Sequence, residues 1–529
     1  MFLLHVIGSQ KTFFARLRRR SPSPLRLKSF LSALSAEALR VLGGQKLSPN
    51  PEPHSGNPFP LDTIPLAQSH SANLSSTLQT ITAESSAPHI EDAGRQPSRP
   101  QKNRHIARYI VLTIAAFILT VWLDGLLTRL PSLGGTPARG ERVGVIHVHT
   151  NASCGSGSLP QIIATARSAN LSFLTVTDHN QTMAQADVAA ADPPDFAVID
   201  GEEVSTSSGH FLALGVDDTW PRGSSRDARS LMASTRRAHA VNFIAHPFGL
   251  RDRWGDWSVS DYDGIEIFND DAVWRKNTVV DLVIAAVMYP VNPRLALLRL
   301  ARTPQENFTK WDQLLQQRPV AGICGSDAHA NIIIGQRSIL KFPSYFSVFS
   351  LARQHVLLDN QPGVDTDHAG ADVILNAIKS GDSFCSIDSF YPADGFTQVV
   401  TAPNTTATSP PGQTNAAGQP KAATENSKAI SVGAETSPLF AAGPGQSIPW
   451  SPSAVLHIKT PPAAGQPILR VLRDGHEIVN QQTDSLDLPL PGPGHYRTEA
   501  YLQQPGLTGW HRWTLWIFAN PVYVTAPKN

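Results

Sequence analysis

The pattern of apolar and polar positions divides the sequence into stretches of different character, and the first of them has no core-forming pattern. Residues 1–105 alternate basic clusters with Ser, Pro, Gln and Asn, and apolar periodicity is confined to a short piece around 31–42. Such a composition is typical of a disordered tail. The first twenty residues carry an Arg run and no acidic residue, so they resemble a targeting leader, with a loosely structured cytoplasmic tail as the alternative.

The second stretch, residues 109–130, is a candidate transmembrane helix. It contains a single charge, Asp124, before Arg129. As a helix it extends about 33 Å, which suffices to cross a hydrocarbon core of about 30 Å. A buried core helix and a cleaved signal peptide are weaker interpretations, because a disordered tail offers no core and about a hundred residues precede the segment.

Basic residues flank this segment more densely on its N-terminal side. They are Arg95, Arg99, Lys102, Arg104 and Arg108, against Arg129, Arg139 and Arg142 beyond it. The positive-inside rule then predicts a single-pass membrane protein with a signal-anchor helix. Its N-terminus is expected in the cytoplasm, and everything after residue 130 on the outer (periplasmic or extracytoplasmic) side.

From residue 142 to about 400, short β-type runs alternate with helical patterns such as 159–169 and 225–240. The predicted strands are 143–149, 172–178, 195–204, 210–216, 241–247, 264–269 and 320–327. This alternation predicts an α/β fold with a parallel sheet that closes or nearly closes into a barrel. In such barrels the active site lies at the carboxyl ends of the strands.

The apolar segment 279–301 could be mistaken for a second membrane span. Prolines and arginines interrupt it, and its longest uncharged run is well short of a span. We expect two helices joined at the prolines and packed on the barrel, where they can form a wall over the site.

The C-terminal part of the chain has a different texture. Residues 401–447 are rich in Ala, Pro, Thr and Gly, which is typical of a linker. Residues 448–527 contain short strand patterns separated by Asp-Gly and Pro-Gly turns, which predict an all-β module, a small sandwich. A structural cap on the barrel and a carbohydrate- or partner-binding module are the two interpretations of this module.

Composition and charge exclude some functions. The 44 Lys and Arg residues balance 43 Asp and Glu residues, so the chain lacks the basic surplus typical of nucleic-acid binding, and no nucleic-acid partner is expected. Three cysteines, Cys154, Cys324 and Cys385, are too few for a disulfide framework but allow one bridge or a thiolate ligand.

Potential metal ligands stand at the ends of the predicted strands. In chain order they are His147 and His149 in HVH, Asp178 and His179 in TDH, Glu202 and Glu203 in GEE, His210 in GH, His246 in AHP, and Asp327 and His329 in SDAH. An i, i+2 pair on a strand points to one face. Imidazoles mixed with carboxylates favour Zn, Mn or Fe over Ca or Mg.

In order and local context, these motifs resemble the series of the PHP (polymerase and histidinol phosphatase) family of metal-dependent phosphoesterases, over residues 143–400. The resemblance implies a distorted (β/α)7 barrel that holds two or three divalent ions at its rim. It assigns His147, His149, Glu203 and Asp327 to one ion. Glu203 bridges to a second ion held by His210 and His246, and His179 and His329 hold a third. Glu203 is preferred to Glu202 because the family pattern is G-x-E and alternation sends Glu202 to the other face.

The chain departs from the family pattern in the loop after HVH. Where the family has an aspartate, this sequence has Cys154. A thiolate can ligate Zn or Fe, which would preserve a third site of softer character. Loss of that site is the second possibility, and a disulfide from Cys154 to Cys324 or Cys385 is the third.

These features predict a membrane-anchored phosphoesterase that hydrolyses a small phosphate ester with a metal-activated water. Asp178 and His329 are the candidate catalytic side chains, and Asp178 and Glu266 are expected to orient histidine ligands. Phosphate contacts from Arg251, Arg253 or Arg337 are a weaker expectation than ordinary surface positions. The alternative from another class is a catalytically reduced surface module, a sensor or scaffold. A proofreading exonuclease and a related amidohydrolase are disfavoured, the first by the membrane span and neutral charge, the second by the lack of a lysine at the rim. The sequence does not decide substrate, metal or oligomeric state.

Overall fold

The computed structural model describes residues 102–134, 137–183, 186–188, 196–216, 220, 225–334, 337–359, 369–403, 439–509 and 512–527. All of them belong to one compact unit, Pro97–Asn529. The predicted disordered tail lies almost entirely outside the described residues, and so does most of the predicted linker.

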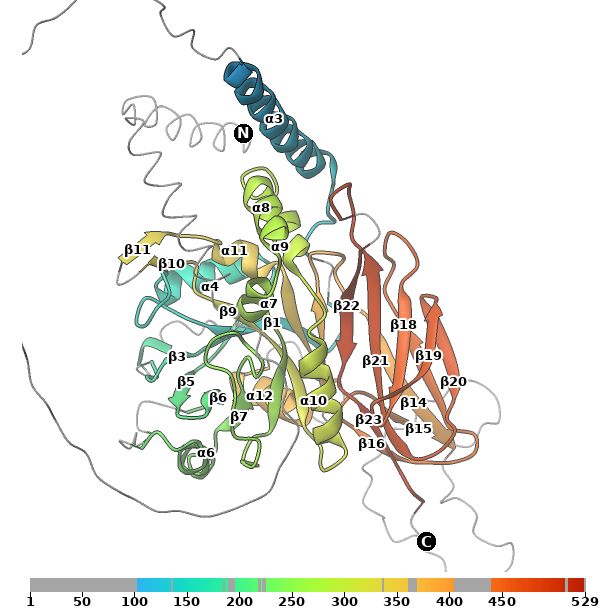
Figure 1. Ribbon diagram of the computed structural model, residues 1–529. Coiled ribbons are helices and arrows are strands. Elements are labelled where there is room, and N and C mark those ends of the chain that lie inside the picture. The colour runs from blue at the N-terminus through green and yellow to red at the C-terminus, as the bar shows by residue number, and fades with distance from the viewer. Residues whose placement is uncertain are drawn as a thin grey trace, which may run out of the picture. The chain divides into compact units, whose positions relative to one another are not determined.

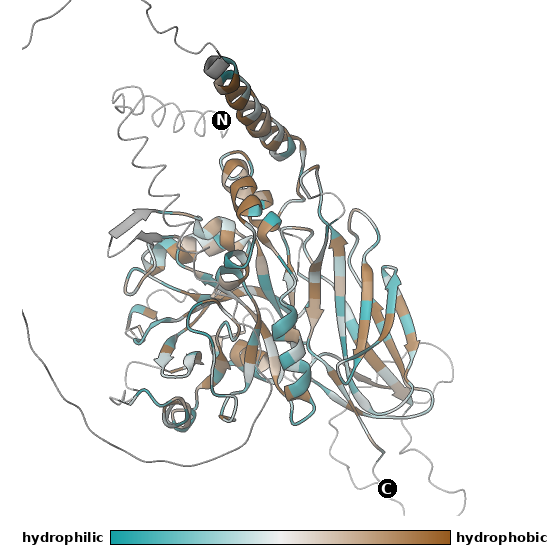
Figure 2. Ribbon diagram, viewed as in Figure 1, coloured by the Kyte–Doolittle hydropathy of each residue, from teal (hydrophilic) through white to brown (hydrophobic). Residues whose placement is uncertain are grey.

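Helix α3 (Lys102–Leu127) contains residues 109–127 of the predicted membrane segment 109–130 (Figure 1). Its stretch His105–Leu127 is, within the described part of the chain, the one helix long and apolar enough to cross a membrane. Most of its length is coloured as hydrophobic residues in Figure 2, and many of these side chains are exposed, for example Tyr109 at 69% and Leu112 at 54%. Only near its C-terminal end do side chains such as Asp124 become buried.

The central sheet forms a closed ring of strand pairings that starts and ends at β1. In order around the ring the strands are β1 (Glu141–Val148), β2 (Phe173–Val176) with its continuation β3 (Asp178–His179), β4 (Ala197–Ile199) with its continuation β5 (Gly201–Thr206), β6 (Gly209–Leu214), β7 (Val241–Ile244), β8 (Gly264–Asn269) and β9 (Ala321–Ala328). All neighbours are parallel except β6, which is antiparallel to β5 and β7. Every strand predicted between residues 143 and 327 lies in this ring.

The predicted distorted (β/α)7 barrel is not confirmed. β5 and β6 form a hairpin, and β7 leads to β8 through residues 245–263 without a helix. The five residues between the predicted strands 195–204 and 210–216 are too few for a parallel crossover, which needs about a dozen, and Gly209, at φ +115°, closes the turn. The fold is therefore a mixed α/β fold with a central sheet.

Helices cover this sheet and connect its strands. They are α4 (Leu159–Ser168), α6 (Ala228–Arg237), α7 (Asp270–Arg275), α8 (Val279–Met288), α9 (Pro293–Leu300), α10 (Gln305–Leu315), α11 (Tyr345–Phe349) and α12 (Ala371–Ser380), with a small hairpin of β10 (Ile332–Ile334) and β11 (Arg337–Leu340). The prediction of two helices within 279–301 is confirmed by α8 and α9. Asn292 caps α9 and Pro293 occupies its first turn, an arrangement that starts a new helix.

Two strands that the sequence did not predict connect the ring to the C-terminal β region. β12 (Ala352–Leu357) pairs with β1, and β13 (Ser383–Ile387) pairs with β12 and with β22 (Trp513–Ala519). The sheet therefore runs on without a break from the ring into the C-terminal strands.

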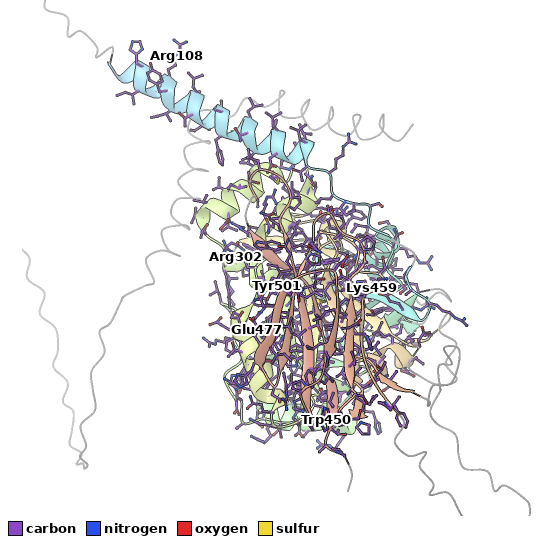
Figure 3. All side chains as sticks on the ribbon, turned by 90° about the vertical axis from the view of Figure 1, so that its right-hand side faces the viewer. Arg108, Arg302, Trp450, Lys459, Glu477 and Tyr501 are labelled. Atoms are coloured by element: carbon purple, nitrogen blue, oxygen red, sulfur yellow. A yellow bond between two sulfur atoms is a disulfide. The ribbon has the colours of Figure 1, made fainter. Side chains whose placement is uncertain are left out.

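The C-terminal β region carries mostly antiparallel strands (Figure 3). Its members are β14 (Thr397–Pro403), β15 (Leu439–Ala442), β16 (Ser447–Pro449), β17 (Val455–Lys459), β18 (Ile468–Arg473), β19 (His476–Gln482), β20 (Ser485–Pro489), β21 (Gly494–Gln503), β22 and β23 (Val522–Thr525). β14 and β15 lie before residue 448, where we predicted the module to begin. The region packs on α10, where Arg497 pairs with Asp312 at 2.7 Å and Trp311 contacts Phe518.

Candidate metal centre

The carboxyl end of β1 brings two histidines together. The rings of His147 and His149 are buried and their centroids lie 5.1 Å apart. Simple alternation does not produce this geometry, because His147 has φ +68° and the pairing register shifts between residues 146 and 148. Asp327 and His246 also have positive φ. Such strain in residues other than glycine is concentrated at functional sites.

Four buried side chains converge at this strand end: His147, His149, Glu203 and Asp327. Their ligand atoms all lie within 4.8 Å of one another. Glu203 Oε2 is 3.2 Å from Nε2 of both histidines, and Asp327 Oδ1 is 3.3 Å from His149 Nε2. Nevertheless the two Nε2 atoms and Glu203 Oε2 are buried without a hydrogen bond of good geometry. The atoms point at a common space rather than at one another, as metal ligands do, so the residues fit a divalent cation.

Glu203 also faces a second group of ligands with its other oxygen. Oε1 lies 2.7 Å from His210 Nδ1 and 3.0 Å from His246 Nε2. His179 Nδ1 approaches Oε2 at 3.0 Å, because β3 and β5 pair with His179 opposite Glu203. Glu203 therefore has the position of a bridging carboxylate, the role that the sequence resemblance implies.

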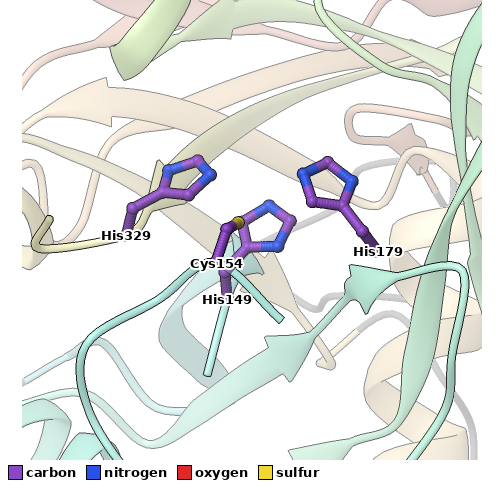
Figure 4. A group of neighbouring side chains, drawn as sticks. All are labelled: His149, Cys154, His179 and His329. Atoms are coloured by element: carbon purple, nitrogen blue, oxygen red, sulfur yellow. The ribbon is translucent and has the colours of Figure 1, made fainter. Parts of the chain in front are cut away.

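A third group surrounds Cys154 (Figure 4). The ligand atoms of His149, Cys154, His179 and His329 lie within 4.8 Å of one another. The sequence reasoning placed Cys154, His179 and His329 together and did not include His149 in this group. Burial raises the pKa of the Cys154 thiol, but the three surrounding imidazoles outweigh it and lower that pKa to about 4. The thiol is therefore predisposed to be a thiolate.

The cysteine pairing excludes one of the three alternatives left open for Cys154. Cys324 of β9 and Cys385 of β13 form a disulfide, and Cys154 is free. The possible disulfide from Cys154 is therefore excluded in this structure, because β9 and β13 bring the other two cysteines together.

Asp178 holds the loop that carries Cys154. Its carboxylate accepts hydrogen bonds from the Thr150 amide at 2.8 Å, from the Thr150 hydroxyl at 2.6 Å and from the Ser153 hydroxyl. We expected Asp178 to orient a histidine ligand, but within the described residues its hydrogen-bond partners belong to this loop. Gly155 allows the loop to close, because a Cβ at this position would lie 2.2 Å from the His149 carbonyl oxygen.

Glu266 does contact a histidine as predicted. Its Oε1 lies 2.8 Å from His147 Nδ1, while its Oε2 accepts from the His246 amide at 2.6 Å and from Asn269 Nδ2 at 2.9 Å. The carboxylate is fully buried. It fixes the orientation of His147 and leaves its Nε2 free for a cation.

The electrostatics of the centre suit cations. Burial opposes ionisation, but the imidazoles around Glu203 and Asp327 hold the pKa of both carboxyls well below the usual range. Burial lowers the pKa of His179, but Cys154 and Glu203 raise it to about 9. Burial likewise lowers the pKa of His246, but the surrounding carboxylates, chiefly Glu203, raise it to about 9. Divalent cations would replace these protons as the positive charge between the carboxylates.

The centre opens into a cavity of about 520 Å³. It is lined by histidines and carboxylates of the centre and by side chains of α7, α8 and α9, most of which are apolar. Asp270 also lines it and was missed by the sequence reasoning, although it directly follows the predicted strand 264–269. Neither Asp270 oxygen makes a hydrogen bond of good geometry in the described part of the chain. Burial and the nearby Asp327 raise the pKa of Asp270 well above its usual range.

The candidate phosphate-binding arginines differ in position. Arg251 lines the cavity. Arg253 lies 5.0 Å from the Phe248 ring and outside the cavity lining. The side chain of Arg337 lies outside the described residues.

A second buried ionic cluster lies away from the centre, between β1, β12 and β13. His355 Nδ1 contacts Glu141 Oε1 at 2.6 Å, and its Nε2 lies 2.9 Å from Ser386 Oγ and 3.4 Å from Asp388 Oδ1. Burial lowers but these carboxylates raise the pKa of His355, to about 10. Both ring nitrogens are engaged, so this cluster is a structural ion pair that joins the three strands.

Comparisons with known proteins complete the description. No protein-family model and no curated protein matches the sequence. Among solved structures, a two-domain protein from Bacteroides vulgatus that contains a predicted PHP-like metal-dependent phosphoesterase is similar over 74% of this chain and 99% of its own, at 10% identity and a TM-score of 0.31.

Two further solved structures are similar over shorter parts of the chain. One is assigned as a metal-dependent phosphoesterase, from Bifidobacterium adolescentis (39% of this chain, 91% of its own, 15% identity, TM-score 0.25). The other is an amidohydrolase from Chromobacterium violaceum with bound sulfate and no metal (35% of this chain, 87% of its own, 15% identity, TM-score 0.25). The solved structures similar to this chain thus include PHP-like metal-dependent phosphoesterases, the family whose motif series the sequence resembles.

Proposed function

We propose that this protein is a membrane-anchored, metal-dependent phosphoesterase. The observation that carries the proposal is the set of buried ligand atoms around Glu203. His147 Nε2, His149 Nε2 and Glu203 Oε2 are buried without good hydrogen bonds, and each Nε2 lies only 3.2 Å from that oxygen. Leaving three such atoms unsatisfied is costly unless a cation binds them.

Two or three divalent ions of the Zn, Mn or Fe type suit the donor set. His147, His149, Glu203 and Asp327 would hold one ion, and Glu203 with His210 and His246 a second. Cys154, His179 and His329 would hold a third, with a thiolate in place of a carboxylate. Divalent ions in such a centre supply neutralising charge for a phosphoryl group and acidify a water molecule.

The remaining residues of the site position these ligands and move a proton. Glu266 orients His147 through the 2.8 Å contact to Nδ1, and Asp178 fixes the loop of Cys154. Asp270 lies in the cavity, and burial and the nearby Asp327 raise its pKa well above the usual range. This shift favours the protonated form, which is the form that donates a proton to a leaving oxygen. The His329 side chain is 24% exposed and lines the cavity, so an entering ester could contact it.

We further propose that α3 is the membrane anchor, with the N-terminus in the cytoplasm and the metal centre outside. The length and exposed apolar surface of α3 support the anchor, and its basic N-terminal flank supports the orientation. The disulfide between Cys324 and Cys385 agrees with an oxidising compartment. A periplasm-dependent reporter inserted after residue 130 tests this topology. Activity only with a cytoplasmic reporter would overturn it.

The activity is tested on the full chain in detergent with a panel of phosphate monoesters and diesters and added Mn or Zn. We expect hydrolysis by the wild type and none by His149→Ala, with His476→Ala, an exposed residue of β19, as the matched control. Bound metal without hydrolysis of any ester would instead favour the catalytically reduced surface module. Unchanged hydrolysis by His149→Ala would place the site elsewhere.

A further inference from the structure

We infer that the substrate is a phosphate ester that carries a hydrocarbon chain and is taken from the membrane in which α3 lies. This inference rests on the proposed function and names its class of substrate. It is carried by three features: an apolar lining of the cavity, an outward apolar face on the helix that walls it, and the attachment of that helix to α3.

The cavity that holds the metal centre has a chemically mixed lining. Besides the ligands, the lining contains a set of apolar side chains, Val273, Leu282, Ala285, Leu297, Leu300 and Phe342, and charged side chains that include Arg251, Asp271 and Arg275. The apolar set comes from α7, α8, α9 and the segment before α11. A phosphate bound at the ligands would therefore have its ester group directed at hydrocarbon-like surface. A small polar alcohol would leave this surface in contact with water, whereas an alkyl chain covers it.

Helix α8, which forms one wall, is apolar on both sides. Leu282 and Ala285 line the cavity, while Val279, Val280 and Val283 are 53%, 66% and 44% exposed. Asp281 is the one charged residue of α8, and its carboxylate forms ion pairs with Arg302 at 2.5 Å and Arg512 at 2.8 Å. A helix without a polar face is typical of contact with lipid or with more protein.

The attachment of α8 and α9 to α3 indicates that the exposed face of α8 contacts lipid rather than another protein. Trp122 of α3 donates from Nε1 to the Val287 carbonyl at 2.8 Å, and Asn292 donates to the Gly125 carbonyl at 2.9 Å. Asp124 accepts from the Leu507 amide at 2.7 Å and faces Arg299 at 3.3 Å. The last turns of α3 are thus fixed to the wall of the cavity.

A membrane that contains α3 must therefore lie close to the exposed face of α8. Leu507, 61% exposed beside the Asp124 contact, adds to this apolar surface. Figure 2 shows α8 mostly in the colour of hydrophobic residues. The cavity consequently combines a metal centre with an apolar wall beside the bilayer, the arrangement that a lipid phosphate requires.

The test uses the full chain in detergent and two homologous series, n-alkyl phosphates and n-alkyl p-nitrophenyl phosphates with chains of two to twelve carbons, below their micelle-forming concentrations. For the series that is hydrolysed, we expect kcat/KM to rise roughly fourfold per methylene until the apolar lining is covered. Calorimetry with the metal-free protein should likewise show dodecyl phosphate binding more tightly than ethyl phosphate. Equal binding and a flat series would overturn the inference.

A variant that fills the space beside the apolar lining provides the internal check. Ala286 of α8 lines the cavity and is exposed. Ala286→Phe should therefore narrow the space for the alkyl chain and lower kcat/KM for the longest ester at least tenfold, which flattens the dependence of kcat/KM on chain length. Ala164→Phe, on the exposed side of α4 and outside the cavity lining, is the matched control and should keep the slope. An unchanged slope in Ala286→Phe would contradict the assigned chain path.

The outcomes separate this inference from the proposed function. Hydrolysis of short and long esters at equal rates leaves the phosphoesterase proposal intact and removes the lipid substrate. Hydrolysis of no ester by metal-loaded protein removes the phosphoesterase proposal. In that case tight binding of dodecyl phosphate would still support the apolar lining as a chain-binding site.

Discussion

Glu203 Oε2 and His149 Nε2 lie 3.2 Å apart in the buried interior, and neither atom makes a good hydrogen bond within the described residues. A cation that attracts both atoms would explain why they approach so closely without forming a hydrogen bond. The same glutamate reaches His210 with its other oxygen at 2.7 Å. Glu203 is therefore the residue on which the groups of ligands depend.

The thiol of Cys154 should be a ligand of the third group. Cobalt-substituted wild-type protein is expected to show a sulfur-to-cobalt charge-transfer band in the near ultraviolet, and Cys154→Ala is expected to lose it with about one equivalent of metal. Cys154→Asp should keep the metal but shift its preference from Zn toward Mn. A band that persists in Cys154→Ala would show that Cys154 is not a ligand.

Glu266 should act by orienting His147. Replacing Glu266 with Gln removes the negative charge that accepts a hydrogen bond from His147 Nδ1. We therefore expect the affinity of the protein for metal to fall about 10- to 100-fold. Competition with a chelator measures the affinity, and circular dichroism checks the fold. Glu306→Gln, at a surface pair with Lys276, is the matched control. An unchanged affinity in Glu266→Gln would exclude the positioning role.

Asp270 should donate a proton to the leaving group. Asn has the shape of a protonated Asp but cannot donate that proton, so Asp270→Asn is expected to lower kcat for alkyl esters about 100-fold. Esters of p-nitrophenol, whose leaving group needs no proton, should be affected far less. The basic limb of the kcat profile of the wild type against pH should also disappear in the variant. An equal loss for both leaving groups would point to a structural effect.

His355 should make stability depend on pH. Its folded pKa of about 10 lies above the usual value of about 6.5. The stabilisation is therefore complete below about pH 6.5 and declines as the pH rises through 10. We expect His355→Gln to be about 3 kcal/mol less stable than wild type at pH 6, measured by urea unfolding of the full chain.

The difference in the free energy of unfolding between the wild type and His355→Gln should shrink toward pH 10. His476→Ala, at an exposed position, should follow the wild type throughout. A difference that stays constant with pH would show that packing rather than charge stabilises this cluster.

Much of the ring could be predicted from sequence, because its strands are short apolar runs that end in ligands. The order of the motifs along the chain is enough to place His147, Glu203, His246 and Asp327 at one end of the sheet. α8 and α9 were predictable because prolines interrupt the segment 279–301 and its longest uncharged run is too short to span a membrane.

Other features depend on contacts between distant parts of the chain. The antiparallel β6 follows from a turn too short for a helix, which alternation alone does not reveal. β12 and β13 were missed because polar residues such as Arg353, Gln354 and His355 are buried there by partners far away in sequence. Asp270 was missed because its significance lies in a buried carboxyl without a good hydrogen bond, which only packing creates.

The most direct test of the central claim is the metal content of the purified full chain, measured by mass spectrometry after removal of loosely bound ions. We expect at least two divalent ions per wild-type chain, at most one in Glu203→Gln, and the wild-type number in the surface control Glu306→Gln. A wild type that binds no transition metal, or a Glu203→Gln protein that keeps the full number, would contradict the central claim.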